Sequence, residues 1–498
     1  MHEYVNLWDR VVSYFSPGAG VRRAKNRVIL SQIRKYEAGS HSKRTRNFMT
    51  SRTSADVLAT VAGPLIRERA RYMERNNAYI RRAVKIIRTN VAGTGVKLGL
   101  QSTRKRQLRV AKSLWKTWAE STDCDFMGRK NLYAIQRLVV SRYYVDGEVF
   151  VRFRRNSDPR NPIQLQVLEA DYLDTTRHQI TSSVTGNIID HGIELDPDGR
   201  KVAYYFYRQH PHGNDLRRQI ETVRVPADEV LHIYYEERPG QLRGVSEMAA
   251  SIIPLRDFAE YEDAQLIRQK IAACFTAFVT GPADPRPSAE QTDGSLPLER
   301  VEPGIIEYLP PDKSVTFGNP PETNNYDEYA RTVLRGAAAG LGLSYESFTG
   351  DLSNVNFSSA RMGWLDQSRF IREIQDDILI TQLLGPAWRE FLRANQIAGN
   401  LAITARYEVS WTPPRREMID PSKEVGALVE MVRAGFESKQ SIIRQLGNDP
   451  EQLSIEIAAD MSETDRLGSM PTTDPRYDPK RAGPEEDSDG ENAGATSQ

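Results

Sequence analysis

The stretch Tyr144-Val-Asp-Gly-Glu-Val-Phe-Val-Arg-Phe-Arg154 lies where the hydrophobic period of the chain changes. Apolar side chains recur at helical spacing from about residue 131 to residue 145. From Glu148 onward they alternate with polar ones, and the alternation returns at 163 to 168 after a turn rich in Asn, Asp and Pro. A helical segment that leads directly into successive strands predicts an α+β fold.

Further helices and strands are expected on either side of this stretch. The segment from 246 to 279 has helical character, and Pro254 must kink the helix or begin a new one. A helix from about 326 to 341 is followed by a polar loop at 349 to 359 and a helix at 360 to 395. The remaining predicted helices are 55 to 90, 104 to 120 and 422 to 457, and the remaining strands lie near 187 to 194, 201 to 208, 229 to 235, 304 to 317 and 402 to 411.

The composition is that of a large folded protein without a membrane span. The chain has 498 residues, of which 39% are hydrophobic and 27% charged, with a mean hydropathy of -0.55. The apolar stretch Ile271 to Val279 has half of the roughly 18 residues that a spanning helix needs. The N-terminus does not resemble a signal peptide, so synthesis in the cytoplasm is expected. Cys124 and Cys274 lack disulfide or metal spacing and are expected to be buried.

Charge is distributed unevenly along the chain, although the net charge is only +1. Residues 1 to 110 hold 24 Lys and Arg against 6 Asp and Glu, whereas residues 449 to 498 hold 4 against 13. A dedicated duplex-binding protein is normally basic overall, because counterion release from phosphates supplies most of its affinity. Near neutrality therefore favours a protein that contacts nucleic acid without holding it tightly. We expect a basic arm at 1 to 54 and a disordered acidic tail at 466 to 498.

The motifs of common enzymes are absent from the sequence. No Gly-Lys dipeptide occurs, which argues against a standard P-loop ATPase. Neither HExxH nor GxSxG occurs, so the usual signatures of zinc proteases and α/β-hydrolases are missing. Gly93-Thr-Gly95 follows a helix and precedes a strand, the reverse of a dinucleotide-binding turn, and is interpreted as a helix end. We predict that the chain is not an enzyme and uses no cofactor.

The histidines do not predict a metal site. His210-Pro-His212 lies in a polar turn without cysteine or paired carboxylate ligands nearby, which indicates a surface loop. His178, His191 and His232 are scattered along the chain. No metal ligands are predicted.

Four motifs carry a family resemblance. The most specific is Leu334-Arg-Gly-Ala-Ala-Ala-Gly-Leu-Gly342 followed by Asn356-Phe-Ser-Ser-Ala-Arg361. The others are Arg81 to Gly95, Tyr144 to Arg152 with Leu165 to Asp171, and Val230 to Tyr234 with Arg238 to Gly244. Counted along the chain, with the Arg81 motif first, the Tyr144 motif second, the Val230 motif third and the Leu334 motif fourth, they resemble the lambda-type portal proteins of tailed bacteriophages, over about residues 55 to 460. Two departures are Ser246, where the family usually has proline, and Phe357, where it usually has tyrosine.

The resemblance implies a non-enzymatic subunit of a dodecameric ring at the portal vertex of the virion. Assembled in the host cytoplasm, the ring would form the channel for DNA packaging and ejection. The implied partners are other copies of the chain, double-stranded DNA passing through without sequence recognition, the terminase large subunit, the major capsid protein and the head-tail adaptor, with no membrane. The implied regions are a wing of helices then strands at 55–245, a stem helix and clip at 246–303, wing strands at 304–325, channel-side helices at 326–418 and a helical crown at 419–465.

The same resemblance places the family's tunnel loop at 349 to 359. A translocation channel should not bind its cargo tightly, since each neutralised phosphate adds affinity that must be broken at every step. Between Arg335 and Arg361 there is no Lys or Arg, and short polar side chains favour exchangeable, water-mediated contacts. The alternative is an ordinary helix connection facing solvent. The DNA-facing residues predicted are Thr349, Asp351, Ser353, Asn354, Asn356, Ser358 and Ser359.

Two other functions stay open on the sequence. One is another non-enzymatic head or connector component such as an adaptor ring, which differs in stoichiometry and does not dock a terminase. The other is a nuclease or head-maturation protease without the usual motifs. That reading requires Asp and Glu, or Ser and Lys, side chains that converge in a pocket.

Overall fold

The computed structural model describes residues 52–179, 186–213, 221–273, 277–280, 314–317, 326–353, 355–414 and 420–468, with Tyr14, Gly18, Lys25, Pro471, Asp474 and Arg476. The internal contacts divide the chain into two units, Met1–Val57 and Leu58–Gln498. Most of the predicted arm, the predicted loop from 281 to 303 and most of the predicted acidic tail lie outside the described residues.

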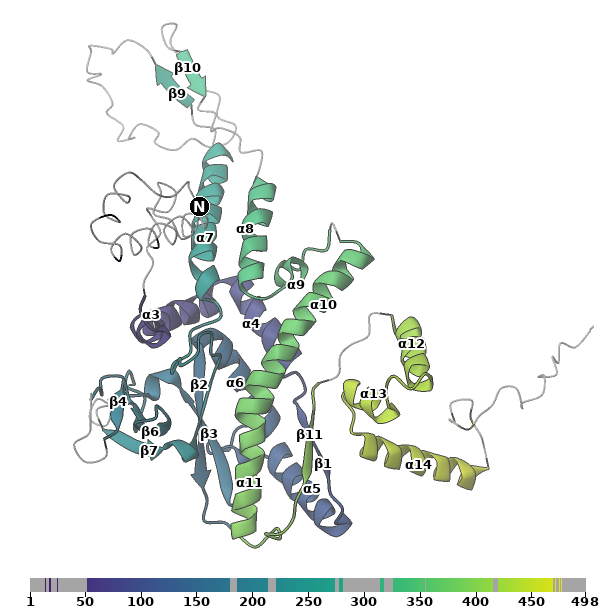
Figure 1. The fold of residues 1–498 in the computed structure, drawn as a ribbon. Helices are drawn as coiled ribbons and strands as arrows, with labels where there is room; N and C mark the ends of the chain where they lie inside the picture. Colours follow the sequence, from purple (N-terminus) through teal and green to yellow (C-terminus); the bar gives the residue numbers. More distant parts are fainter. Residues whose placement is uncertain are drawn as a thin grey trace, which may run out of the picture. The chain divides into compact units, whose positions relative to one another are not determined.

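Helices and strands are mixed along the chain, which confirms the predicted α+β class (Figure 1). The helices are α3 (Ala55–Asn76), α4 (Ala78–Val91), α5 (Lys105–Glu120), α6 (Leu132–Asp146), α7 (Ala249–Ala273), α8 (Tyr326–Gly340), α9 (Tyr345–Thr349), α10 (Phe357–Glu373), a π-helical segment (Ile374–Leu384), α11 (Gly385–Ile397), α12 (Pro421–Arg433), α13 (Lys439–Gln445) and α14 (Pro450–Leu467). The strands are β1 (Lys97–Gln101), β2 (Glu148–Arg155), β3 (Ile163–Glu169), β4 (Ile188–Asp190), β5 (Ile193–Leu195), β6 (Lys201–Tyr207), β7 (Thr222–Pro226), β8 (Val230–Tyr234), β9 (Ala277–Thr280), β10 (Ser314–Phe317) and β11 (Glu408–Thr412).

The predicted change from helix to strand takes place at Gly147. Asn131 caps the start of α6, because its side chain accepts a hydrogen bond from the backbone N–H of Ala134 at 2.9 Å. Gly147 ends this helix in the left-handed region, at φ +85°. A Cβ atom at this position would lie 2.3 Å from the carbonyl carbon of Val245. The left-handed backbone and the close approach of Val245 each require glycine, so the entry of β2 into the core depends on Gly147.

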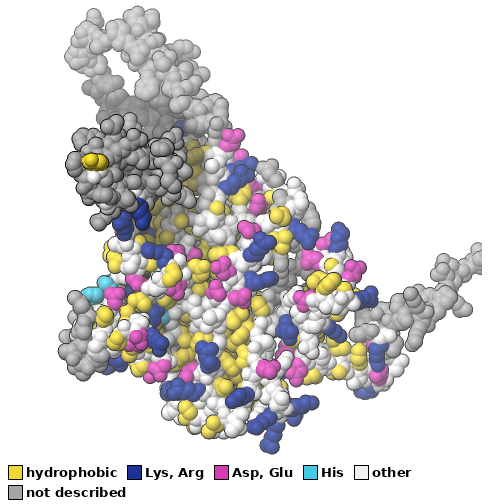
Figure 2. Space-filling model, in the orientation of Figure 1, with side chains coloured by type: hydrophobic (Ala, Val, Ile, Leu, Met, Phe, Trp, Pro, Cys, Tyr) yellow, Lys and Arg dark blue, Asp and Glu magenta, His cyan; other side chains and the backbone are white. Residues whose placement is uncertain are grey.

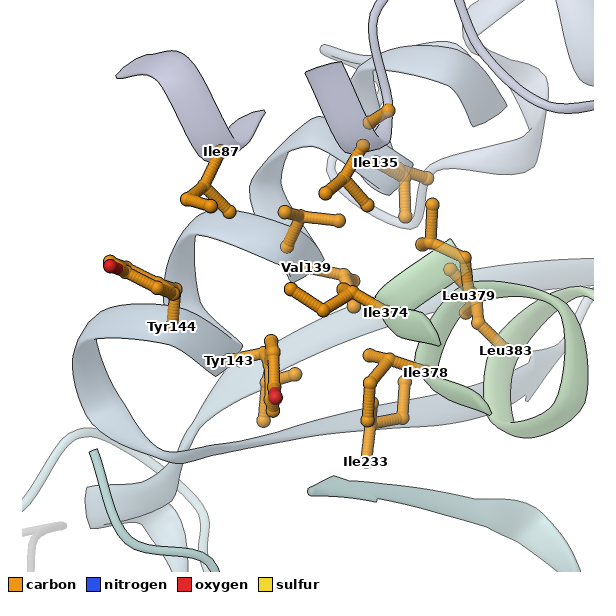
Figure 3. Close-up of a cluster of buried hydrophobic side chains, with 14 of the residues drawn as sticks. Ile87, Ile135, Val139, Tyr143, Tyr144, Ile233, Ile374, Ile378, Leu379 and Leu383 are labelled. Carbon is orange, nitrogen blue, oxygen red and sulfur yellow. The ribbon is translucent and has the colours of Figure 1, made fainter. Parts of the chain in front are cut away.

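The central sheet has three antiparallel strands in the order β3-β2-β8. Helix α6 and the π-helical segment pack against it, and their side chains form the main hydrophobic core (Figure 3). Because β2 is buried on both faces, it shows a nearly continuous run of buried residues at its start. Members of this core include Ile87, Ile135, Val139, Tyr143, Tyr144, Ile233, Ile374, Ile378, Leu379 and Leu383.

A second, smaller core joins the central sheet to a four-stranded antiparallel sheet in the order β4-β5-β6-β7. Phe150 of β2 contacts Phe206 and Tyr204 of β6, with ring centroids 5.1 and 5.7 Å apart. His232 of β8 stacks on the same phenylalanine at 4.3 Å. The four-stranded sheet is therefore held to the body of the fold by aromatic packing around β2.

The predicted helix at 246–279 is wrong at its end. Helix α7 ends at Ala273, and residues 277–280 form β9, which pairs antiparallel with β10. The run of apolar residues is compatible with either structure, and a strand much later in the chain decides between them. Pro254 does not begin a new helix, since α7 runs from Ala249 through it. Proline in the second turn removes only one internal hydrogen bond.

The predicted helix at 55–90 is two helices, α3 and α4, and the predicted strand near 187–194 is the hairpin of β4 and β5. Other differences concern boundaries near the C-terminus and one missed strand. The single helical region predicted for 422–457 is three helices, whose starts are capped by the side chains of Asp420, Ser438 and Asp449. The strand predicted for 402–411 begins only at Glu408. Strand β7 was not predicted, because its alternation is short and follows a polar turn.

Candidate functional site

The predicted tunnel loop lies between α9 and α10 and is shorter than the range 349 to 359. Thr349 is the last residue of α9, and residues from Phe357 onward already belong to α10. Gly350 ends α9 in the left-handed region at φ +80°, and its N–H donates to the carbonyl oxygen of Glu346 at 2.8 Å. The connection between α9 and α10 runs from Gly350 to Asn356, and the chain turns there into α10 (Figure 1).

Asp351 organises the first half of this loop. One oxygen of its carboxylate accepts hydrogen bonds from the backbone N–H and the hydroxyl of Ser353, at 3.0 and 2.6 Å. The other accepts from the hydroxyl of Tyr345 at 3.1 Å. The hydrogen bonds from Ser353 lower the pKa of Asp351, so this carboxylate stays charged at neutral pH. The arrangement is an Asx-type turn, which is the geometry that the solvent-loop alternative also predicts.

The other predicted loop residues differ in their exposure and partners. The Thr349 hydroxyl donates back to the Tyr345 carbonyl at 2.8 Å, within α9. Ser353, Asn356 and Ser358 are exposed, and the Ser358 hydroxyl donates to the Asn356 side-chain oxygen at 3.1 Å. Asn354 and the side chain of Ser359 lie outside the described residues.

Two arginines from other helices reach the base of this loop. Arg82 of α4 donates from Nε to the carbonyl oxygen of Ser347 at 2.8 Å, and its guanidinium lies against Gly350. The guanidinium of Arg335 lies over the ring of Tyr345, 5.4 Å from its centre. The loop from Gly350 to Asn356 contains no Lys or Arg, but these two arginines lie at its base. Arg82 belongs to the first of the four sequence motifs, and that was the only sequence signal for its role.

A buried charge network lies at the junction of α3, α6, β2 and β8. Its members are Arg67, Arg71, Asp146, Glu148, Asp171 and Arg243. Its centre is Glu148, whose side chain is completely inaccessible to solvent. Arg243 donates from Nε to both oxygens of this carboxylate, at 3.0 and 2.9 Å, and also from Nη2. Arg67 donates to one of the same oxygens at 3.0 Å. A single carboxylate therefore holds two buried guanidinium groups.

Arg71 completes the network on its more exposed side. Its guanidinium donates to both oxygens of Asp146, at 2.8 and 2.9 Å, and to Asp171 at 2.6 Å. Asp171 is also bound by Arg67 at 2.8 Å. The network thus contains three arginines, Arg67, Arg71 and Arg243, and three acids, Asp146, Glu148 and Asp171, so that its formal charges cancel.

The pKa shifts in this network follow from the pairing. Burial alone would raise the pKa of Glu148, but Arg243 and the hydrogen bond from His232 hold it well below its usual range. Burial and the nearby ammonium of Lys201 lower the pKa of His232 to about 3, so its ring is neutral. Its Nε2–H donates to Glu148 at 3.0 Å, and its Nδ1 lies 3.3 Å from Lys201. Every group is paired, and the cluster is suited to structure rather than to proton transfer.

The network unites residues of the sequence motifs. Asp146 and Glu148 belong to the second motif, as does Asp171, and the third contains His232 and Arg243. Sequence reasoning used these motifs for the family resemblance but predicted no interaction among them. A signal was present, since acids beside a buried strand require partners.

A second, partly buried carboxyl group belongs to Glu247, and it forms no ion pair with a Lys or Arg of the described residues. Glu247 accepts a hydrogen bond from the Tyr143 hydroxyl at 2.6 Å, beside a cavity of about 230 Å³. Burial and the charges of Glu237 and Glu373 raise the pKa of Glu247, although the Tyr143 hydrogen bond opposes the shift. Glu373 in turn accepts from the Tyr235 hydroxyl at 3.0 Å. Two tyrosines and two glutamates therefore line this cavity, and we assign no catalytic role to them.

The structure corrects the interpretation of the histidines. His178 and His191 are not scattered in space, because their rings lie 5.1 Å apart, beside Asp190. His232 is buried in the second core, whereas His210 and His212 are neighbours in a turn. Within the described part of the chain, no helix combines the length and apolarity that crossing a bilayer requires.

The sequence matches agree with one another. A family model described as phage portal protein, lambda family, matches residues 41–375. A probable portal protein of Halomonas phage phiHAP-1 is 30% identical over 452 residues, which cover 85% of this chain and 86% of that protein. Portal protein B of Escherichia phage lambda is 19% identical over 464 residues, covering 81% and 84%. A solved chain from the virion of a native gene transfer agent particle has a TM-score of 0.45 and 16% identity, covering 79% of this chain and 94% of that one.

Proposed function

Because the chain belongs to the lambda family of phage portal proteins, we propose that its copies form a dodecameric ring at one capsid vertex, through which DNA is packaged and ejected. The portal role and the place in the virion come with membership of this family, which is structural rather than enzymatic. We assign no catalytic step to the chain.

The single observation that best supports a ring is the apolar surface that one subunit leaves uncovered. On α3, Leu58, Val61 and Leu65 are 46%, 78% and 49% exposed, at the spacing of one helical face. The opposite face of α3 is buried and includes Ala70 and Met73. An uncovered apolar stripe on a helix whose other face is already packed is typical of a subunit interface.

The α7–α8 pair shows the same pattern. These helices lie side by side (Figure 1), with Tyr261 of α7 against Tyr329 of α8 at a ring distance of 4.7 Å. Beyond Phe258, no described side chain of α7 is buried, and Leu266 and Ile267 are about half exposed. We propose that this part of α7 is the stem and that copies of the pair cover one another around the ring. A ring formed in this way repeats one heterologous contact until it closes.

The remaining regions are assigned by their order along the chain. The wing is 55–245 with the strands of 304–325, the crown is 419–465, and the proposed clip within 280–303 lies almost wholly outside the described residues. We propose that the clip docks the terminase large subunit and later the head-tail adaptor. The major capsid protein is proposed to contact the outside of the ring.

The loop from Gly350 to Asn356 is proposed to face the DNA. Its exposed side chains include the short, polar Ser353 and Asn356 as well as the apolar Leu352, which is 68% exposed, and the Asp351 carboxylate is charged. On the face drawn in Figure 2, Lys and Arg are interspersed with Asp and Glu rather than gathered in one basic surface. A chain without a strong positive field suits passage rather than retention of DNA. The arginines at the loop base, Arg82 and Arg335, are exposed and contact Ser347 and Tyr345, respectively.

Ring formation is tested by native mass spectrometry and negative-stain electron microscopy of the purified protein. Wild-type protein should form closed perforated rings. Replacing Val61 and Leu65 with glutamate should shift the population to monomers, because two charges per subunit would be buried in the interface. The matched Val61→Met variant keeps an apolar surface and should assemble like the wild type. Wild-type protein that stays monomeric or dimeric in all salt conditions would contradict the proposal.

The loop assignment is tested on assembled rings by duplex binding at several salt concentrations. Asn356→Lys rings should bind duplex more tightly at low salt, and the slope of log affinity against log salt should steepen by about 0.9 for each phosphate contacted. Ser157→Lys adds the same charge at an exposed position in the turn between β2 and β3 and serves as the control. Equal affinity and slope for the two variants would place the Asn356 position away from DNA.

A further inference from the structure

His178, Asp190 and His191 form a cluster at one end of the four-stranded sheet. The Nδ1 atom of His191 lies 2.6 Å from an oxygen of Asp190, and the Nδ1 atom of His178 lies 3.4 Å from the same oxygen. One ligand atom from each of the three residues lies within 4.8 Å of the others. Their side chains are 51%, 31% and 39% exposed in chain order, so an ion from solvent can reach them.

The local fold brings these residues together by two backbone features. Strands β4 and β5 form a hairpin in which Asp190 pairs with Ile193, leaving His191 and Gly192 as the two turn residues. Both have positive φ, +43° and +86°, as a type I′ turn requires. Gln179 pairs with Ile189 through two hydrogen bonds of 2.8 Å, which places His178 beside the end of β4.

One of the ligand separations matches that of a tetrahedral zinc site. Ligand atoms about 2.0 to 2.1 Å from a zinc ion lie roughly 3.4 Å from one another. The separation of His178 from Asp190 already has this value, and the shorter separation of His191 opens with a small rotation of partly exposed side chains. Two imidazoles and one carboxylate are a ligand set that zinc accepts, with a fourth position left for water.

The charges around the cluster also favour a cation. Among the described residues, Asp190 has ion pairs with the two histidines and with no Lys or Arg. The neighbouring Arg177 is held away, because its guanidinium contacts Asp174 at 3.3 Å and lies over the ring of Tyr205. In the part of the chain that the structure describes, Asp190 therefore has no direct ion pair with a basic side chain, although it interacts electrostatically with the buried Arg243.

A second cluster of possible metal ligands differs from the first in the basic side chains that surround it. Glu169, Asp171 and His210 also bring three ligand atoms within 4.8 Å of one another. Both of its carboxylates, however, are bound by arginine: Arg71 contacts Glu169 at 3.2 Å and Asp171 at 2.6 Å. A divalent ion there would have to displace guanidinium groups or lie beside them. The two clusters have similar ligands and opposite electrostatic surroundings.

We propose that His178, Asp190 and His191 bind one zinc ion per subunit. The ion fastens the segment around His178 to the tip of the β4–β5 hairpin, adding to the backbone hydrogen bonds that link Gln179 with Ile189 and Gly192 with Arg177. Its role is structural, since it holds the edge of the four-stranded sheet. The proposal does not depend on ring formation or on the position of the DNA-facing loop.

The test is isothermal titration calorimetry of tag-free, metal-stripped full-length protein with zinc chloride. One site per subunit is expected. The double variant His178→Gln/His191→Asn should lose at least about tenfold in affinity, as loss of metal-site groups commonly does. Asparagine is chosen at 191 because it tolerates the left-handed backbone of the turn. Zinc should also raise the unfolding temperature of the wild type but not of the double variant.

The double variant His210→Gln/His212→Gln is the matched control. It removes the same number of imidazoles from the turn beside the second cluster and should leave zinc affinity unchanged. Cobalt substitution adds a spectroscopic readout, since a tetrahedral site gives visible absorption that the His178/His191 variant should lack. Equal zinc affinity in the wild type and that variant, with both folded by circular dichroism, overturns the proposal. Loss of binding only in the control would assign the site to the second cluster instead.

Discussion

The surroundings of Glu148 and Glu247 differ in one respect that decides how each carboxyl group behaves. Both residues are removed from solvent near the end of α6, and both accept strong hydrogen bonds. Glu148 has two guanidinium groups against it, and its pKa is lowered. Glu247 has a tyrosine hydroxyl and two further acids, and its pKa is raised. Depth of burial alone therefore does not set the charge state, because the available cations outweigh it.

The largest expected effect is that of removing the charge of Glu148. The Glu148→Gln variant should lower the free energy of unfolding by about 3–5 kcal/mol, because it leaves Arg243 buried without its counter-charge. Chemical denaturation measures this loss. Arg152→Ala is the control, because its ion pair with Glu229 is partly exposed and should contribute less than about 1 kcal/mol. Equal small losses in both variants would contradict the central role of Glu148.

The pH dependence sharpens the same prediction. A lowered pKa means that the stabilisation by Glu148 is fully present above its unfolded pKa and is lost as the pH falls below that value. Below about pH 4.5, where unfolded glutamate takes up a proton, wild-type stability should fall more steeply than that of Glu148→Gln. The difference in slope should be about 1.4 kcal/mol per pH unit, which corresponds to one proton.

The smallest effect, and one of opposite sign, is expected at Glu247. A raised pKa means that the charged form opposes folding, so stability is lost as the pH rises through the unfolded value toward the folded one. Glu247→Gln keeps an acceptor for the Tyr143 hydroxyl and should stabilise the protein at pH 8 by roughly 0.5 kcal/mol, with no gain at pH 4. Thermal unfolding at the two pH values measures the difference. Destabilisation at pH 8 would show that the Glu247 charge is compensated by a cation.

The helices and central strands could be predicted because their signals are local. The period of 3.6 before Gly147 and of 2 after Glu148 appears within windows of ten or so residues. The caps at Asn131 and Asp420 are likewise read from single side chains followed by a hydrophobic run. A prediction was wrong where pairing with a distant segment determines the secondary structure. At 277–280, for example, pairing with β10 gives a strand in place of the expected helix.

The candidate sites were harder to predict than the elements that carry them. The position of the loop was predicted approximately, but its boundaries and the arginines at its base were not. Arg82 is 265 residues from the backbone oxygen that it binds. The His178 and His191 pair was missed because it depends on the pairing of Gln179 with Ile189, which residue spacing does not reveal.

By itself, the sequence determined the class of the fold, the order of its elements and the family, since each depends on local periodicity or on motifs in order. Only the tertiary structure decided which charges meet. Arg67, Glu148, Asp171 and Arg243 come from four separate segments, and the arginines pair with the acids only because burial removes water as a partner. The opposite shifts of Glu148 and Glu247 have the same origin, because a pKa depends on the charges that the folded chain brings within a few ångströms.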